Sequence, residues 1–271
     1  MKVSFIGGGN MAVALIGGMK TKGFSAAGIQ VVEPSEEARQ RLTAAFGVRT
    51  SAVADPSFLS CEVLMLAVKP QQMRMALLPL AGNLGPQQMV ISIAAGVRLA
   101  EISRWLGGHR KIVRTMPNTP ALIGAGISGL YADPSVDPEG RDRAEKILGA
   151  VGQTIWLQQE AQMDGITAIS GSGPAYVFYF MEALEAAAGE LGFGSEEARQ
   201  LAVDTFLGAA KLAANAKEPL AVLRERVTSK GGTTEAALKS FATDHIEVAI
   251  GRGVRAAAAR GRELGDLLSK E

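Results

Sequence analysis

The amino-acid sequence predicts a doubly wound α/β domain with a mostly parallel sheet, followed by an all-helical domain. Up to about residue 157, short β-branched apolar runs alternate with helical patterns, which is typical of a parallel sheet covered on both faces. From about Met163 onward the strand pattern disappears and helical segments follow one another. We therefore expect two domains, residues 1–160 and residues 161–271.

The first domain contains apolar runs that predict strands, each bounded by a helical pattern or a turn. These runs are KVSFIG (2–7), IQVVE (29–33), EVLMLAV (62–68), MVISIA (89–94) and KIVRTM (111–116). The helical patterns between them cover residues 10–23, 35–47, 70–82 and 99–107. Strands separated by helices predict parallel pairing, because a parallel neighbour is reached only through a crossover connection.

The second domain contains successive helical patterns. They cover residues 175–192, 195–216, 219–227, 233–244 and 245–271. Ser195, followed by two glutamates, resembles an N-cap with an acidic first turn, and Pro219 suits the first turn of the next helix. Pro174, inside SGSGPAY (170–176), predicts a kink or a break. The many alanines permit close helix packing, and so much apolar surface in a small domain favours completion of its core by dimerisation.

Composition and charge narrow the classes of partner. The chain has 28 Lys and Arg against 27 Asp and Glu, which is a nearly neutral balance. It contains no basic stretch of the kind that binds nucleic acid, so we expect no nucleic-acid partner. No stretch has the apolar length of a membrane span or a signal peptide, and we expect a cytoplasmic protein with no membrane partner. Cys61 is the one cysteine, and we interpret it as a small strand-entrance residue rather than a nucleophile. His109 and His245 lack metal-ligand spacing, so we expect no metal site.

A glycine-rich turn joins the first predicted strand to the first predicted helix, with the pattern Gly7-x-Gly9-x-x-Ala12. Gly7 permits a tight turn, and Gly9 lets the backbone approach a pyrophosphate. Ala12 permits close packing of helix on strand, and the N-terminal turn of the helix supplies N–H donors to an anion. The position of the motif in an alternating pattern predicts a Rossmann-type dinucleotide site.

The second strand ends at Glu33, about 20 residues past the glycine motif, where an acid can bind the adenine ribose hydroxyls. Its charge would repel a 2′-phosphate and favours NADH, whereas the nearby Ser35 and Arg39 favour NADPH. We therefore expect NADPH or NADH as cofactor. Two further strand ends, residues 66–71 and 92–97, carry Lys-Pro or small residues and point to the same crevice.

Seven motifs along nearly the whole chain resemble the pyrroline-5-carboxylate reductase family. They are FIGGGNMA (5–12), LAVKPQ (66–71), SIAAG (92–96), RTMPNTPALIGAG (114–126), MDGITAISGSGPAYVF (163–178), LGAAK (207–211) and TSKGGTTEAAL (228–238). The resemblance implies a Rossmann domain followed by a helical dimerisation domain. It also implies reduction of the cyclic imine 1-pyrroline-5-carboxylate to L-proline, the last step of proline biosynthesis, by a homodimer that can assemble into larger rings.

The resemblance further implies the residues that contact the cofactor. They are Gly7, Gly8, Gly9, Asn10 and Met11 in the first turn, Glu33 and Ser35 after the second strand, Ala67, Val68, Lys69 and Pro70 after the third, and Ala94, Ala95 and Gly96 after the fourth. Many members carry an asparagine near the adenosine ribose, in a loop that here reads TSAVADPS (50–57) and has none. The choice between NADPH and NADH stays open.

The stretch SKGGTTEAAL (229–238) runs two glycines and two threonines into a helical pattern. It is either a tight turn between packed helices or a helix end whose bare N–H groups bind an anion. The resemblance favours the second interpretation, with the substrate carboxylate bound by the Ser229 hydroxyl and by the amides of Gly231, Gly232 and Thr233. It makes the Thr234 hydroxyl the candidate catalytic partner, or proton donor, of the ring nitrogen.

Some alternatives remain. Asn118 either lines the nicotinamide pocket or caps its own turn, and SGSGPAY is mainly structural, with substrate contact from Ser172 the lesser alternative. A β-hydroxyacid dehydrogenase would need a catalytic lysine and a following asparagine, which SGSGPAY does not supply. A non-catalytic dinucleotide sensor would have no use for the glycine–threonine turn.

Overall fold

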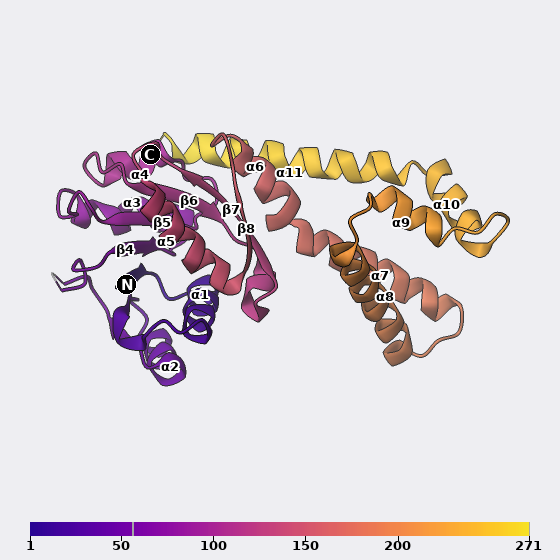
Figure 1. Ribbon diagram of the computed structural model, residues 1–271, viewed down its shortest axis with the longest axis horizontal. Coiled ribbons are helices and arrows are strands. Elements are labelled where there is room, and N and C mark those ends of the chain that lie inside the picture. The colour runs from indigo at the N-terminus through magenta and orange to yellow at the C-terminus, as the bar shows by residue number, and fades with distance from the viewer. Residues whose placement is uncertain (56, 271) are drawn as a thin grey trace. The chain divides into compact units, whose positions relative to one another are not determined.

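The computed structural model describes residues 1–55 and 57–270 and divides into two compact units (Figure 1). One unit contains Met1–Ser172 and the chain from Ala257 on, and the other contains Gly173–Ala256. The C-terminal turns of the last helix therefore belong to the N-terminal unit, which sequence patterns did not indicate. The division by role at residue 160 stays a prediction.

The N-terminal unit contains one mixed sheet. Its strands are β1 (Val3–Ile6), β2 (Ile29–Val32), β3 (Arg49–Ser51), β4 (Val63–Leu66), β5 (Met89–Ser92), β6 (Ile112–Met116), β7 (Gly126–Ala132) and β8 (Gly152–Trp156). Their order is β3-β2-β1-β4-β5-β6-β7-β8, and neighbours run parallel except β6 and β7. This topology confirms the doubly wound, mostly parallel fold class.

Helices and short helical turns connect these strands. The α-helices are α1 (Asn10–Thr21), α2 (Glu36–Phe46), α3 (Pro70–Leu77), α4 (Leu99–Trp105), α5 (Pro138–Leu148) and α6 (Gln162–Ile166). Short 3₁₀ turns cover Ala26–Gly28, Leu78–Leu80, Thr119–Ile123 and Gly149–Val151, and a π-helical segment covers Thr167–Gly171.

The core of this unit lies on both faces of the sheet. In β4, Val63 and Met65 belong to one buried cluster, whereas Leu64 and Leu66 belong to a second. All four side chains are buried, which explains why the run is continuously apolar instead of alternating. Burial on both faces holds the carboxyl ends of the strands in place.

Three strands, β3, β7 and β8, were not among the predicted runs. β7 reads GISGLYA, and glycine and serine lower its strand propensity. The structure requires one of these glycines, because a Cβ on Gly129 would lie 2.8 Å from the side chain of Ile166 on α6. A glycine that lowers the strand propensity is therefore required by packing against α6.

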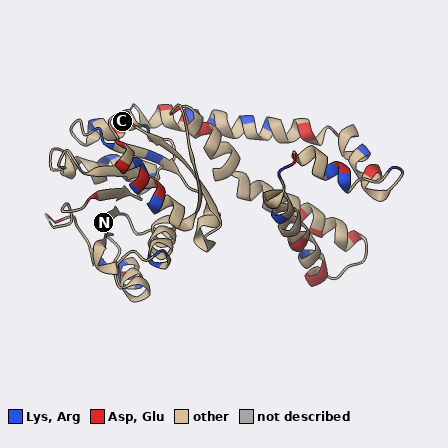
Figure 2. Ribbon diagram, in the orientation of Figure 1, with Lys and Arg blue, Asp and Glu red and all other residues tan. Residues whose placement is uncertain are grey.

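The second unit is helical. It contains α7 (Gly173–Glu190), α8 (Ser195–Asn215), α9 (Leu220–Arg226), α10 (Thr233–Thr243) and the first part of α11 (Ile246–Leu268). The helices α7, α9 and α10 bury no residue within the single chain. Figure 2 shows acidic and basic residues interspersed along the helices of both units. No helix in residues 1–55 and 57–270 combines the length and apolarity that crossing a membrane requires.

Of two local expectations in the helical region, one was wrong and one is confirmed. The N-cap of α8 is Gly194 and not Ser195, because Glu197 reaches back and accepts a hydrogen bond from the Gly194 amide at 3.1 Å. The break expected at Pro174 is confirmed: the helical run ends at Gly171, Ser172 is a non-helical bend, and Pro174 lies in the first turn of the new helix α7. The irregularity lies just before it, in the π-helical segment Thr167–Gly171.

Candidate cofactor and substrate sites

The glycine-rich turn after β1 leaves the N-terminus of α1 open. Gly7 has φ +96°, and a Cβ there would lie 2.6 Å from the carbonyl oxygen of Ala67, so no other residue fits. A Cβ on Gly9 would meet nothing within 4 Å, and Gly9 is the N-cap of α1 without a side-chain cap. The first-turn amides of α1 and the open space at Gly9 fit a pyrophosphate.

Glu33 lies against this turn, as its position in the sequence predicted. Its Oε2 accepts a hydrogen bond from the Gly8 amide at 2.9 Å, and its Oε1 accepts one from the Ser35 amide at 2.9 Å. The Ser35 hydroxyl caps α2 by accepting from the Ala38 amide at 3.3 Å. Arg39 donates to the carbonyl oxygens of Glu33 and Pro34 at 2.8 and 2.7 Å, which holds it at the end of β2.

The remaining predicted cofactor residues lie at neighbouring strand ends. Ala67–Pro70 follows β4 and Ala94–Gly96 follows β5, and the sheet places β2, β1, β4 and β5 side by side and parallel. Their carboxyl ends therefore form one edge, which is where ligands bind in open α/β sheets. Lys69 is exposed there, and Gly96 has φ +78°. The structure brings the residues together, and their contact with a cofactor stays a prediction.

Asn118 has a structural role that the sequence did not indicate, and its place in the nicotinamide pocket stays a prediction. Its side chain is buried and spans two segments: Nδ2 donates to the Ser170 carbonyl at 3.1 Å, and Oδ1 accepts from the Ile127 amide at 2.9 Å. It makes no side-chain cap of the turn that follows it. Asn118 therefore ties the start of β7 to the π-helical segment.

A buried ion pair beside the β5 end was missed by sequence reasoning. Arg114 on β6 is only 3% exposed and donates from Nη1 to Glu160 Oε1 at 3.0 Å. The same oxygen accepts from the Leu99 amide, the first of α4, at 2.8 Å. An arginine inside the apolar run IVRTM was the available signal, because a buried guanidinium requires an anionic partner.

The glycine–threonine turn lies at the N-terminus of α10, in the helical unit. Gly231 has φ +74°, and Gly232 is the N-cap of α10 without a side-chain cap. Two of the amides predicted to bind the substrate already donate within the chain: Gly231 to Glu235 Oε2 at 2.7 Å, and Gly232 to the Ser229 carbonyl at 3.0 Å. Ser229 and Thr233 are exposed and Thr234 is half-buried, so all three are accessible.

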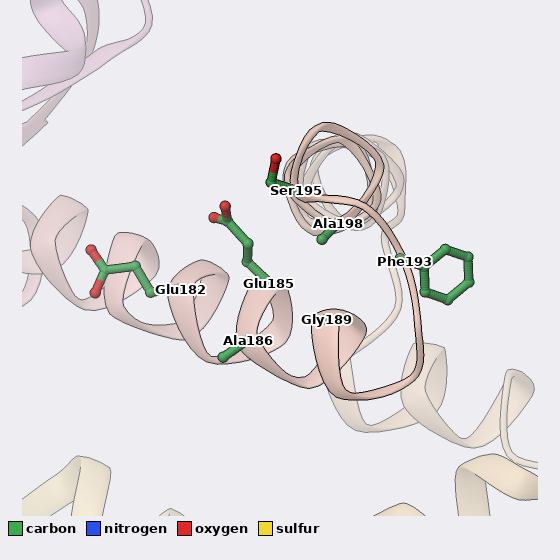
Figure 3. Close-up of a pocket in the computed structure, with 7 residues that line it drawn as sticks. All are labelled: Glu182, Glu185, Ala186, Gly189, Phe193, Ser195 and Ala198. Atoms are coloured by element: carbon green, nitrogen blue, oxygen red, sulfur yellow. The ribbon is translucent and has the colours of Figure 1, made fainter.

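A separate cleft of about 520 Å³ lies between α7 and α8 (Figure 3). In Figure 3 the Glu185 side chain extends from α7 toward the start of α8, and Glu182 lies one turn before it. No predicted site residue lines the cleft, and its charged lining residues are these two glutamates. An anionic substrate is disfavoured there.

Cys61 and metal-binding groups add nothing to the site. Burial raises the pKa of the Cys61 thiol, and the residue lies just before β4, which supports its interpretation as a small packing residue. In the part of the chain that the structure describes, no three histidine, cysteine or acidic side chains form a potential metal cluster.

Comparison with known proteins identifies the family. A pyrroline-5-carboxylate reductase from Pseudomonas aeruginosa is 43% identical over 269 residues, which cover 99% of this chain and 98% of that protein. The chain belongs to the pyrroline-5-carboxylate reductase family. The resemblance expected from the motifs is confirmed, and so is the activity that the family name states.

Family profiles and solved structures agree with this assignment. Residues 160–264 match the family model described as "Pyrroline-5-carboxylate reductase dimerisation". Residues 2–96 match the family model described as "NADP oxidoreductase coenzyme F420-dependent". A pyrroline-5-carboxylate reductase from Coxiella burnetii is 40% identical with a TM-score of 0.91, covering 97% of this chain and 98% of that one. The Plasmodium falciparum pyrroline carboxylate reductase with NADP bound is 25% identical with a TM-score of 0.83, covering 98% of both chains.

Proposed function

We propose that this protein reduces 1-pyrroline-5-carboxylate to L-proline, the last step of proline biosynthesis, with NADPH or NADH as cofactor. The observation that carries the proposal is the identity of 43% with a pyrroline-5-carboxylate reductase over nearly the full length of both chains. The geometry of the two glycine-rich helix N-termini supports it, because the reaction needs one site for a dinucleotide and one for a carboxylate.

The cofactor would lie along the carboxyl edge of the sheet. A reduced nicotinamide dinucleotide supplies the hydride when bound. The first turn of α1, from Gly7 to Met11, would hold its pyrophosphate, and Glu33 with Ser35 would face the adenine ribose. Ala67–Pro70 and Ala94–Gly96 would face the nicotinamide half.

The preferred nicotinamide depends on opposing charges. The Glu33 carboxylate would repel a 2′-phosphate, which favours NADH, whereas Arg39 lies at the same strand end and favours NADPH. The relative from Plasmodium falciparum was solved with NADP bound, which supports binding of the phosphorylated cofactor. Both cofactors therefore belong in the assay.

The substrate carboxylate would bind at the N-terminus of α10. The Ser229 hydroxyl and the amides of Gly231, Gly232 and Thr233 are the proposed donors. Since the Gly231 amide donates to Glu235 here, the substrate carboxylate would replace that internal carboxylate. The Gly232 amide, which now donates to the Ser229 carbonyl, would become available only if the turn opened.

Thr234 is the proposed catalytic partner of the ring nitrogen. Hydride addition to the imine carbon leaves an amine nitrogen, which must carry a proton in the product. The Thr234 hydroxyl, in the first turn of α10, can donate a hydrogen bond to this nitrogen or pass it a proton from water. The imine carbon must lie about 3–3.5 Å from the hydride donor for transfer.

We also propose that the protein works in the cytoplasm as a homodimer and that dimers assemble further. The family match over residues 160–264 names dimerisation, and α7, α9 and α10 bury no residue within one chain. Exposed apolar side chains such as Phe178, Tyr179 and Phe241 would find their partners in a second copy. Light scattering of the purified protein would give the number of subunits.

The proposed function is tested by mixing purified protein with 1-pyrroline-5-carboxylate and following the absorbance of NADPH and NADH in parallel. We expect oxidation of at least one cofactor with stoichiometric formation of proline. Cofactor binding without oxidation of either would contradict the proposal and favour a dinucleotide sensor. Oxidation of the cofactor with a different imine, and not with 1-pyrroline-5-carboxylate, would indicate a reductase for another substrate.

A further inference from the structure

The last turns of α11 contact the β5–α4 turn backbone against backbone. A Cβ on Gly265 would lie 3.1 Å from the Gly96 carbonyl oxygen and 3.4 Å from Arg98 Nη2. Reciprocally, a Cβ on Gly96 would lie 3.5 Å from the Gly265 amide nitrogen. Gly265 is buried, and Figure 1 shows this end of α11 beside α4 in the N-terminal unit.

Two side chains of α11 stabilise this contact. Leu268 is 8% exposed and belongs to the same buried cluster as Ala94 and Val97, which flank the turn. Asp266 accepts a hydrogen bond from Arg98, the N-cap of α4. These contacts join residues about 170 positions apart in the sequence, so the turn is held by the far end of the chain.

The opposite side of the turn is also held. Glu160 accepts from the first amide of α4, that of Leu99, and from the buried Arg114. With α4 fixed at its start and α11 packed on Gly96, the backbone of the turn has little freedom to move. Ala95 alone among its residues is exposed toward solvent, and Gly96 is held at φ +78°.

We propose that Gly265 is a positioning residue: it allows α11 to set the location of the Ala94–Gly96 turn and thereby the affinity for the nicotinamide cofactor. The inference rests on the proposed function, which assigns this turn to the cofactor. A side chain at position 265 would push the Gly96 carbonyl by a few tenths of an ångström, since 3.1 Å is tighter than an ordinary contact. The cofactor would lose affinity although no residue that touches it had changed.

The test compares Gly265→Ala with Gly261→Ala, one turn earlier on the same helix. A Cβ on Gly261 would lie 3.7 Å from Asp164, which is an ordinary contact. Both changes add the same methyl group and the same helix propensity, and only the first meets the turn. The dissociation constants for NADPH and NADH are measured on the full-length protein by cofactor fluorescence, together with the unfolding temperature without cofactor.

We expect Gly265→Ala to weaken cofactor binding by about 3- to 10-fold, less than the roughly 100-fold that a 1 Å misplacement can cost in an active site. Its KM for the imine, at saturating cofactor, should change less than twofold. Gly261→Ala should bind the cofactor like the unchanged protein. Wild-type affinity in Gly265→Ala, or equal losses in both variants, would overturn the proposal.

If Gly265→Ala unfolds at a lower temperature, hydrogen exchange of the folded protein distinguishes a displaced turn from a general loss of stability. Faster exchange confined to residues 94–99 would support a displaced turn, whereas unchanged exchange there would overturn it. A protein that binds cofactor but reduces no 1-pyrroline-5-carboxylate would refute the proposed function alone, because the cofactor titration still tests the role of Gly265.

Discussion

Two glycine-rich turns at helix N-termini, one in each unit, share a local design. In the first, Gly7 has a positive φ and lies two residues before Gly9, the N-cap of α1. In the second, Gly231 has a positive φ and lies one residue before Gly232, the N-cap of α10. Neither helix has a side-chain cap, so amides of the first turn remain available to an anion. By local sequence alone the two turns are equivalent anion sites.

Their surroundings differ. Gly7 has no space for a Cβ, because the Ala67 carbonyl lies 2.6 Å away, whereas a Cβ on Gly231 would meet nothing within 4 Å. The first turn is built into a sheet buried on both faces, and the second lies on a helix that buries no residue within the chain. Within one chain the first turn is therefore packed against the sheet, whereas the second has no buried residue in its helix, which agrees with the proposed dimerisation.

The largest effect is expected from Gly7→Ala set against Gly231→Ala. Gly7→Ala suffers both a clash and a left-handed φ, so cofactor binding should fall by about 100-fold or more. Gly231→Ala suffers only the φ, which costs about 1–2 kcal/mol. Cofactor titration and denaturant unfolding of both variants measure the difference, and equal cofactor losses would remove the contrast between the turns.

Thr234→Ala should have the next largest effect. Loss of a hydroxyl that donates to the ring nitrogen should lower kcat by about 100-fold, the lower range for general acid–base groups. Cofactor affinity should not change, because Thr234 is not among the residues proposed to contact the cofactor. Steady-state kinetics with a parallel cofactor titration separates the two constants. An unchanged kcat would take Thr234 out of the chemistry.

A smaller effect, in the opposite direction, is expected from Glu235→Gln. Removing the negative charge weakens the hydrogen bond to the Gly231 amide by about 1 kcal/mol, so the KM for the imine should fall by roughly 5-fold. Glu247→Gln, in the first turn of α11, removes the same charge and serves as the control. If both variants lower the KM equally, general charge repulsion and not displacement of Glu235 is the cause.

The smallest effect should come from His109, which precedes β6 and so lies at the amino end of the parallel strands, opposite the carboxyl edge that carries the Gly7 turn. Burial lowers the pKa of His109, so the folded state favours the neutral ring. The unfolded chain takes up the proton near pH 6.5, and stability therefore falls as the pH drops below that value.

His109→Gln should flatten the fall in unfolding temperature between pH 7 and pH 5, and it should leave the kinetic constants for cofactor and imine unchanged. Thermal unfolding across this range, with kinetics at pH 7, measures both. A variant with the same pH dependence as the parent protein would show that the ring is not kept neutral by burial.

Local chemistry explains which predictions succeeded. Continuous apolar runs correctly predicted β1, β2, β4, β5 and β6, because a strand that is buried on both faces needs an apolar residue at each position. The position of Glu33 beside Gly8 was also foreseeable, since both lie at the carboxyl ends of adjacent parallel strands. By contrast, β7 and β8 were missed, because glycine and polar residues in them are acceptable only in the context of their neighbours.

By itself the sequence determined the Rossmann-type half, the helical half, the glycine turns at Gly7 and Gly231, and the family. Each of these features follows from a short segment of sequence, because a turn or a buried strand depends on residues next to one another. Only the tertiary structure decided that Asn118 bridges two segments, that Glu160 joins Arg114 to α4, and that Gly265 meets Gly96. Such contacts join residues far apart in the chain, and packing alone selects which of them meet.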